Sequence, residues 1–467
     1  MNREVVITGL GIVTPNGIGI RDFWENIVNG KSFFETLPIV RDRGYGEIKG
    51  SEIKDFNLDN YFLQDVNQGK FNKKNYGKVK TDDKSIQFAV LGTRLALENA
   101  VLEYNKENND IDVFMGNAEE PIQSNEQVVK VVIQTVMKKT FEEFNKLVRP
   151  FHFFKTKREF VKYKCLLQED KLEEFITFLN KRFGNLYQFT PPNTIDFKSY
   201  AIPAKISSFF NFHGSSICIN TACSSGLDAI GQAYYTIKEG RSNTAIAGGS
   251  EAPITLQAIS CLSNLGVISR TKPKPYCIDR DGFAISEGAG IIVLEEKECA
   301  LKRNAKIYAK IKGYSQSSDA NPQMVMLHPE GEYLKKAIKK TINMSGLNIN
   351  EIDYINTHGT ATKTCDLVET KVIKEVFEEH TNKLNISSTK SMTGHSIGAV
   401  GGIEAIISAL AVQNNLVPPT INLDNPDPEC DLNYTPNKAV ERNIRNSLVI
   451  SMGFGGYNSA LVLGDVT

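Results

Sequence analysis

Residues 217–230 read ICINTACSSGLDAI, and this stretch decides the fold. An apolar run ends in small polar residues, Cys223 lies among them, and an amphipathic helix pattern then begins. This order predicts a buried strand, a tight junction and a helix. A cysteine at such a junction is either a buried apolar residue or a nucleophile, because a helix N-terminus stabilises a thiolate. The stretch alone leaves both interpretations open.

A second stretch repeats this design. Residues 384–410 read LNISSTKSMTGHSIGAVGGIEAIISAL, with an apolar run, a Ser/Thr-rich junction holding Lys390 and His395, and a helix of small residues. The repeat predicts two similar α/β halves that meet at a pseudo-twofold axis and share one site. Small residues let a helix approach a neighbouring backbone closely, so we expect both helices to be central and buried.

Other segments follow the same α/β pattern. Residues 4–9 predict a buried strand followed by a glycine-rich turn, GLGIVTPNG, whose lone GxG is weak evidence for a dinucleotide site. Periodicity predicts a helix over 84–103 and strands within 111–117, 244–253, 288–296 and 447–465.

The composition changes over residues 118–190. This block is strongly helical in pattern, and between Lys138 and Arg182 it carries twelve Lys/Arg against seven Asp/Glu. A solvated helical face is one interpretation; a docking surface for an acidic partner, or a lid, is the other. The Pro-Pro pair at 191–192 marks its end.

The bulk composition limits the class of protein. The 467 residues contain 54 basic and 54 acidic side chains, so the net charge of zero gives no sign of a nucleic-acid or membrane-surface partner. No apolar run approaches the roughly 20 residues of a membrane-spanning helix, and the N-terminus lacks a signal-peptide pattern. The eight cysteines form no CxxC pair, which argues against zinc and against a disulfide framework. We therefore expect a cytoplasmic, reduced protein.

Four reactive residue types lie at predicted junctions. Cys223, Lys390 and His395 are joined by His358, which directly follows an apolar strand in YINTHGTATKTCD (354–366). A lone histidine in such a place is usually structural, but the chain has only six histidines. Because α/β proteins place their sites at such junctions, the coincidence indicates one active site.

These motifs resemble a known family. They are similar to β-ketoacyl-acyl-carrier-protein synthases of the elongating type in the thiolase-fold superfamily, above all synthase II and type II polyketide ketosynthases. The matching segments, in family order, are VVITGLGIVTPNG, NTACSSG, GGSEAP, DRDGFAISEGAG, NTHGTAT, STKSMTGH, GAVGGIEA and GFGGYN. The resemblance implies a five-layered αβαβα fold with halves at 1–265 and 266–467. The region near 118–190 exceeds the family's length by roughly one helical hairpin, which predicts an insertion in the N-terminal half.

The resemblance also implies a reaction, the decarboxylative Claisen condensation of malonyl-acyl-carrier protein with a cysteine-bound acyl group. Cys223 would be the acylated nucleophile. His358 and His395 would flank the malonyl group and stabilise the enolate formed on loss of carbon dioxide. Lys390 would support the site electrostatically, with Glu404 as its ion-pair partner.

Further roles follow from the resemblance. Phe454 would be the gate for the acyl chain, and its amide would form an oxyanion hole with that of Cys223. Thr360 and Thr362 would bind the phosphopantetheine arm, although capping of a turn is an alternative interpretation. Position 457 is Tyr where relatives commonly have Thr.

The implied partners are acyl-carrier protein and a second subunit, as a homodimer or as a heterodimer with another ketosynthase-like chain. No metal or redox cofactor is expected, since the phosphopantetheine arm arrives with the carrier protein. The alternative is a non-catalytic partner subunit of the chain-length-factor kind, but such subunits have lost the cysteine. A degradative thiolase would need a second cysteine near the C-terminus, which SMGFGGYN lacks. The motifs are shared by fatty-acid and polyketide enzymes, so the pathway stays open.

Overall fold

The computed structural model describes residues 3–41, 47–103, 109–118, 198–323 and 328–466. In these residues one large mixed sheet has the strand order β12-β11-β15-β16-β10-β1-β9-β7-β5-β6. The elements of its first half are β1 (Val5–Thr14), α5 (Lys84–Ala100), β5 (Asp112–Gly116), α9 (Ala201–Phe210), β6 (Ser216–Ile219), α10 (Ser225–Lys238), β7 (Thr244–Glu251) and β9 (Gly288–Glu296). The elements of the second are β10 (Ala309–Ser318), α13 (Glu332–Ser345), β11 (Tyr354–Asn356), α14 (Lys363–Phe377), β12 (Asn385–Ser387), α16 (Val400–Asn414), β15 (Asn446–Gly453) and β16 (Tyr457–Gly464).

The two halves have the same topology. Outward from the antiparallel pair of β1 and β10, the neighbours are β9, β7, β5 and β6 on one side and β16, β15, β11 and β12 on the other. The pairing directions are the same in both halves. Counting outward from the centre, the first two pairings are antiparallel and the next two are parallel. The internal repeat predicted from the sequence is therefore confirmed.

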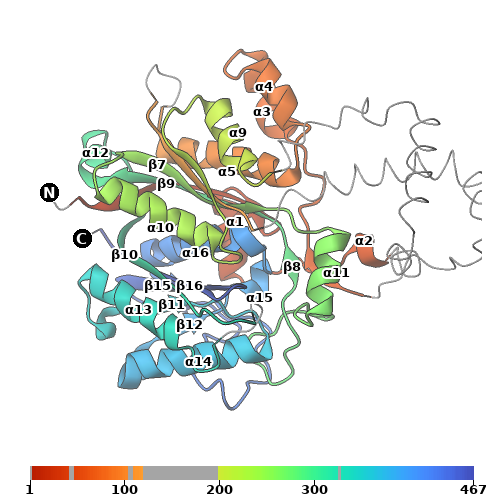
Figure 1. Ribbon diagram of the computed structural model, residues 1–467, viewed down its shortest axis with the longest axis vertical. Helices are drawn as coiled ribbons and strands as arrows, with labels where there is room; N and C mark the ends of the chain where they lie inside the picture. The colour runs from red at the N-terminus through yellow and green to blue at the C-terminus, as the bar shows by residue number, and fades with distance from the viewer. Residues whose placement is uncertain (1–2, 42–46, 104–108, 119–197, 324–327, 467) are drawn as a thin grey trace, which may run out of the picture. The chain divides into compact units, whose positions relative to one another are not determined.

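The helices complete five layers (Figure 1). Helices α5 and α9 cover the outer face of the first half-sheet, and α13 and α14 lie on the outer side of the second. Helices α10 and α16 lie between the half-sheets and contact each other and strands of both halves. Each central helix follows the motif that carries reactive side chains, so this layer brings the two junctions together.

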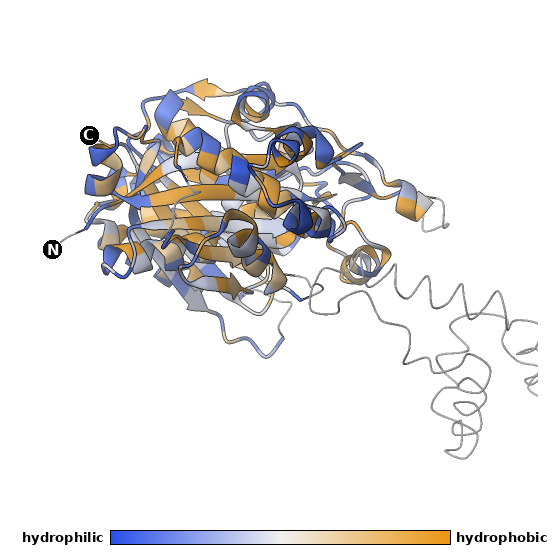
Figure 2. Cartoon of the chain, turned by 90° about the horizontal axis from the view of Figure 1, so that it is seen from above, coloured by the Kyte–Doolittle hydropathy of each residue, from blue (hydrophilic) through white to orange (hydrophobic). Residues whose placement is uncertain are grey.

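The central helices are close because their contact is made of glycines. A Cβ on Gly401 would lie 2.4 Å from the Leu227 nitrogen, and one on Gly226 would lie 2.9 Å from the Gly402 nitrogen. The expected burial of both helices is confirmed. Among the described residues, Ile397–Asn414 is the one helical segment long and apolar enough to cross a membrane, and 89% of it is buried inside the protein. Figure 2 shows hydrophobic residues gathered on strands in the interior.

The first strand differs from its prediction. A turn was expected after residue 9, yet β1 continues to Thr14 and pairs with β9 over most of that length. Helix α5 packs directly on this strand: a Cβ on Gly9 would lie 2.2 Å from the Ala96 carbonyl oxygen, and one on Gly11 would lie 1.9 Å from that of Gly92. These glycines serve close backbone approach rather than a turn.

Smaller elements surround the two halves. The helices are α1 (Ile20–Val28), α2 (Pro38–Arg41), α3 (Asp59–Asn67), α4 (Lys73–Val79), α11 (Leu256–Asn264), α12 (Lys297–Lys302), α15 (Lys390–Thr393), η4 (Ile349–Glu351), η5 (Glu378–Lys383) and η6 (Ile397–Ala399). The short strands are β2 (Gly17–Ile18), β3 (Glu35–Thr36), β4 (Lys49–Ser51), β8 (Ile285–Ser286), β13 (Leu416–Val417) and β14 (Val440–Glu441). The boundary between the halves is predicted from the sequence to lie at 265/266. Strand β9 follows that point in the chain but pairs with β1 and β7 of the first half. The position of the boundary along the chain stays a prediction. The expected insertion at 118–190 lies outside the described residues, apart from Ala118.

Candidate active site

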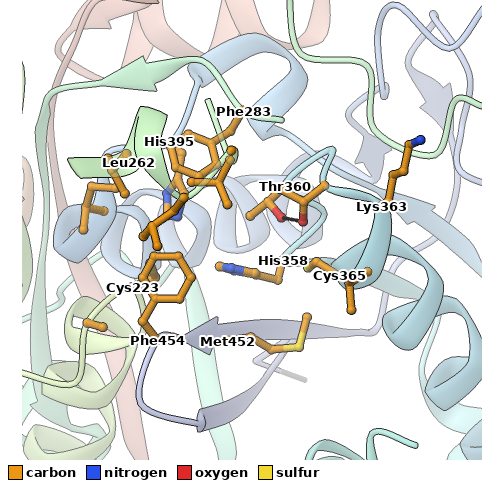
Figure 3. Close-up of a pocket in the computed structure, with 18 of the residues that line it drawn as sticks. Cys223, Leu262, Phe283, His358, Thr360, Lys363, Cys365, His395, Met452 and Phe454 are labelled. Atoms are coloured by element: carbon orange, nitrogen blue, oxygen red, sulfur yellow. Dashed lines mark hydrogen bonds between the residues drawn. The ribbon is translucent and has the colours of Figure 1, made fainter. Parts of the chain in front are cut away.

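One cavity gathers the reactive side chains of both halves. Cys223, His358 and His395 line the same pocket, which has a volume of about 610 Å³ (Figure 3). Cys223 follows β6 in the first half, whereas the histidines follow β11 and β12 in the second. The predicted convergence of these three residues is thus observed.

Cys223 lies in a tight turn directly before α10. The residue before it, Ala222, has φ +53°, in the left-handed region that non-glycine residues rarely adopt. The Ser451 hydroxyl of β15 donates to the Cys223 carbonyl oxygen at 3.2 Å. A Cβ on Gly453, at the end of β15, would lie 3.2 Å from the Cys223 nitrogen. The second half therefore holds the backbone of the turn that presents the thiol, and Cys223 as a residue is only 6% exposed.

His358 is held by a carboxylate that the sequence analysis did not identify. Glu369 of α14 accepts hydrogen bonds from the backbone N–H of His358 at 2.7 Å and of Gly359 at 2.9 Å. Burial raises the pKa of Glu369 to about 7, and these backbone bonds oppose the rise. A glutamate on the buried face of the helix that follows the motif was the one sequence signal available for this contact.

The two imidazoles face each other across the pocket. Their ring centres lie 5.5 Å apart and nearly perpendicular, and the Phe283 ring packs edge-on against His395. Burial lowers the pKa of both histidines well below the ordinary value, and the charge of Lys390 lowers both further. Both rings are therefore neutral near pH 7, and each can present one N–H donor to the cavity.

Lys390 and Glu404 form a buried ion pair behind the pocket rather than on its surface. Lys390 opens the short helix α15, Glu404 belongs to α16, and both side chains are at most 1% exposed. Burial raises the pKa of Glu404 to about 7, and the Lys390 ammonium opposes this. The predicted pairing is observed. Lys390 does not line the pocket and acts on the two histidines electrostatically, by lowering their pKa.

The remaining predicted residues line the same cavity. Thr360 and Thr362 lie in its wall, and their hydroxyls are hydrogen-bonded to each other at 2.9 Å. Thr362 is the N-cap residue of α14 but makes no capping bond with its side chain, so both hydroxyls stay at the pocket wall. Phe454 lines the pocket from the turn between β15 and β16. Apolar side chains that the sequence did not single out complete the wall: Leu262, Leu265, Val267, Phe283, Ile397 and Met452.

Comparison with known proteins identifies the family. The family model described as "Beta-ketoacyl synthase, N-terminal domain" matches residues 2–142 and 179–300, and "Beta-ketoacyl synthase, C-terminal domain" matches 308–424. The chain belongs to the β-ketoacyl synthase family. It is a condensing enzyme, an acyltransferase of fatty-acid or polyketide chain elongation. The N-terminal match omits residues 143–178, within the stretch expected to be an insertion.

Curated relatives cover nearly the whole chain. The 3-oxoacyl-[acyl-carrier-protein] synthase 2 of Staphylococcus aureus (strain COL) is 32% identical over 467 residues, which cover 99% of this chain and 98% of that protein. The protein of that name from Coxiella burnetii is 33% identical, with 99% of both chains covered.

Solved structures share the predicted thiolase-like fold. One is a type II polyketide synthase acyl-carrier protein in complex with its ketosynthase bound to the hexaketide, matched at 27% identity and a TM-score of 0.77 over 100% of both chains. The ishigamide ketosynthase/chain length factor matches in fold at 24% identity and a TM-score of 0.80, again over 100% of both chains.

Proposed function

We propose that Cys223 accepts an acyl group from a thioester and holds it for extension by a malonyl unit. The observation that carries this proposal is that Cys223, His358 and His395 line one and the same pocket. Attack of the thiolate on the incoming thioester forms the Cys223 acyl-enzyme and releases the carrier thiol, which takes up the cysteine proton. The N-terminus of α10 favours the thiolate. The amides of Cys223 and Phe454 are our candidates for stabilising the tetrahedral oxyanion.

His358 and His395 serve the second half-reaction. Loss of carbon dioxide from a malonyl thioester leaves an enolate, whose negative oxygen needs positioned hydrogen-bond donors. Two neutral imidazoles whose centres lie 5.5 Å apart provide one N–H each. The enolate carbon then attacks the acyl-enzyme carbonyl, the Cys223 thiolate leaves, and a β-ketoacyl thioester is formed. The positive charge of Lys390 stabilises the anions along this path.

We assign the acyl donor and the malonyl donor to acyl-carrier protein. The paired hydroxyls of Thr360 and Thr362 are our candidates for binding the phosphopantetheine arm. A second ketosynthase-like subunit, most simply another copy of this chain, pairs with it; β6 ends the large sheet and exposes Ile217 by 45%. The cytoplasmic location and the absence of a redox cofactor remain predictions from the sequence.

The function is tested with a panel of acyl-carrier-protein thioesters that differ in chain length and oxidation state. The enzyme is incubated with each thioester and then with malonyl-carrier protein, and the β-ketoacyl product is measured. Elongation of saturated chains alone assigns the enzyme to fatty-acid synthesis, and elongation of poly-β-keto or polyene chains assigns it to polyketide synthesis. If no member of the panel is elongated, the proposed function is wrong and the non-catalytic alternative returns.

A further inference from the structure

Asp228 is a buried carboxylate that the proposed chemistry does not use. It lies in the first turn of α10 and is 1% exposed. Its Oδ2 accepts hydrogen bonds from the hydroxyls of Thr221 at 2.5 Å and Ser224 at 3.0 Å. Its Oδ1 accepts from the Tyr314 hydroxyl at 2.8 Å and from the Ser459 hydroxyl. Four hydroxyl groups therefore converge on one carboxylate, although Ser224 and Tyr314 each have a second acceptor in reach, the Thr221 carbonyl oxygen at 2.9 Å and Gln316 Oε1 at 3.0 Å.

The two oxygens serve different parts of the molecule. Thr221 and Ser224, on Oδ2, bracket Cys223 in the turn of the first half. Tyr314 and Ser459, on Oδ1, belong to β10 and β16 of the second half. Asp228 thus connects the turn of the nucleophile to the half that carries both histidines.

The turn needs such support because its backbone is strained. Ala222 has φ +53°, which costs a non-glycine residue about 1–2 kcal/mol and persists only when surrounding contacts enforce it. The Tyr314 contact is itself built into the packing: a Cβ on Gly231 of α10 would lie 2.2 Å from the Tyr314 ring. The ring lies against the helix backbone and brings its hydroxyl to Asp228.

We propose that Asp228 is a positioning residue whose carboxylate sets the Cys223 turn relative to the second half, which supplies the candidate oxyanion donor Phe454 for acylation and the two histidines for condensation. The inference rests on the proposed function, because it assumes that Cys223 is acylated. An amide fits the site less well than the carboxylate, because its nitrogen donates instead of accepting, so the two hydroxyls that it faces must turn their hydrogens to other acceptors. Burial raises the pKa of Asp228, and hydrogen bonds from all four hydroxyls oppose that rise.

The primary test is Asp228→Asn in the full-length protein. The acylation rate from acyl-carrier protein is followed by intact mass, together with KM, the thermal midpoint and the alkylation rate of Cys223 by iodoacetamide. A displaced thiol lowers kcat for acylation about tenfold to a hundredfold, and KM stays within about twofold because substrate binding is untouched. Alkylation changes much less, because a small reagent needs no alignment with the second half.

The matched control is Asp112→Asn. Asp112 is also a buried carboxylate, 5% exposed, and its Oδ1 accepts from the Ser215 N–H at 2.6 Å, but it does not line the pocket. This variant is expected to lose thermal stability and to keep the acylation rate.

A second pair of variants keeps the inference testable if Asp228→Asn does not fold. Tyr314→Phe and Ser459→Ala each remove one donor from Oδ1 and keep the carboxylate, and we expect the double variant to lower kcat for acylation more than tenfold at unchanged KM. A folded Asp228→Asn protein, or a folded double variant, that is acylated at the wild-type rate overturns the inference. Absence of acylation in the wild type would instead overturn the proposed function itself.

Discussion

Lys390→Met provides a direct test of the electrostatics of the site. The Lys390 ammonium lowers the pKa of both His358 and His395, after burial, which is the larger cause. Because a positive neighbour disfavours the protonated ring, removal of this charge must raise both pKa values. We therefore expect the pKa of each imidazole to rise while staying below the ordinary value, since burial remains.

The rings also constrain each other. Across the 5.5 Å between their centres, two imidazolium charges would repel by about 3 kcal/mol at an effective dielectric constant of about 20. The pair therefore takes up its protons in two separate steps, and in the variant both steps move to higher pH.

The assay is NMR of protein with isotope-labelled histidine rings, titrated over pH. The chain has only six histidines, so His358→Asn and His395→Asn variants assign the two signals. In the double variant Lys390→Met/Glu404→Gln the same rise is expected, because the shifts come from Lys390 and not from Glu404. Unchanged imidazole pKa values in Lys390→Met would refute the reasoning.

Three further outcomes follow from the structure. In Lys390→Met, Glu404 loses the ammonium that opposes its raised pKa, so its folded-state pKa should lie above about 7. Denaturation should then show stability that is full below about pH 4.5 and declines as pH rises to beyond 7; the double variant with Glu404→Gln should not show this. Gly401→Ala should lower the unfolding free energy by about 1–3 kcal/mol in urea denaturation, whereas Gly77→Ala in α4, with open space around it, should not; equal effects would contradict the packing argument. Thr360→Val and Thr362→Val should each raise KM for carrier-linked substrate about threefold to tenfold. Acylation of Cys223 by a small thioester, which has no pantetheine arm, should not slow. An unchanged KM for carrier-linked substrate would show that neither threonine binds the pantetheine arm.

The junction residues could be found from the sequence. Cys223, His358 and His395 are rare residue types at points where apolar runs end, and local pattern is enough to place them there. Their convergence followed from the internal repeat, which specified two like halves. The ion pair of Lys390 with Glu404 was predicted from the family resemblance.

Other features could not be predicted because they depend on contacts between distant segments. Asp228 bonds to Ser459, 231 residues away, and no periodicity records such a pair. Glu369 looks like any polar residue of an amphipathic helix until the turn of His358 is placed against it. At Gly9 and Gly11 the local signal favoured a turn, but close packing of α5 keeps the chain in a strand.

The most direct measurement is the mass of the protein after incubation with acyl-carrier-protein thioester, followed by peptide mapping. We predict one added acyl group, located on Cys223, which disappears on addition of malonyl-carrier protein as a β-ketoacyl product forms. Cys223→Ala should gain no acyl mass while keeping its thermal midpoint. An acyl group found on any other residue, or a Cys223→Ala protein that still elongates chains, would contradict the account.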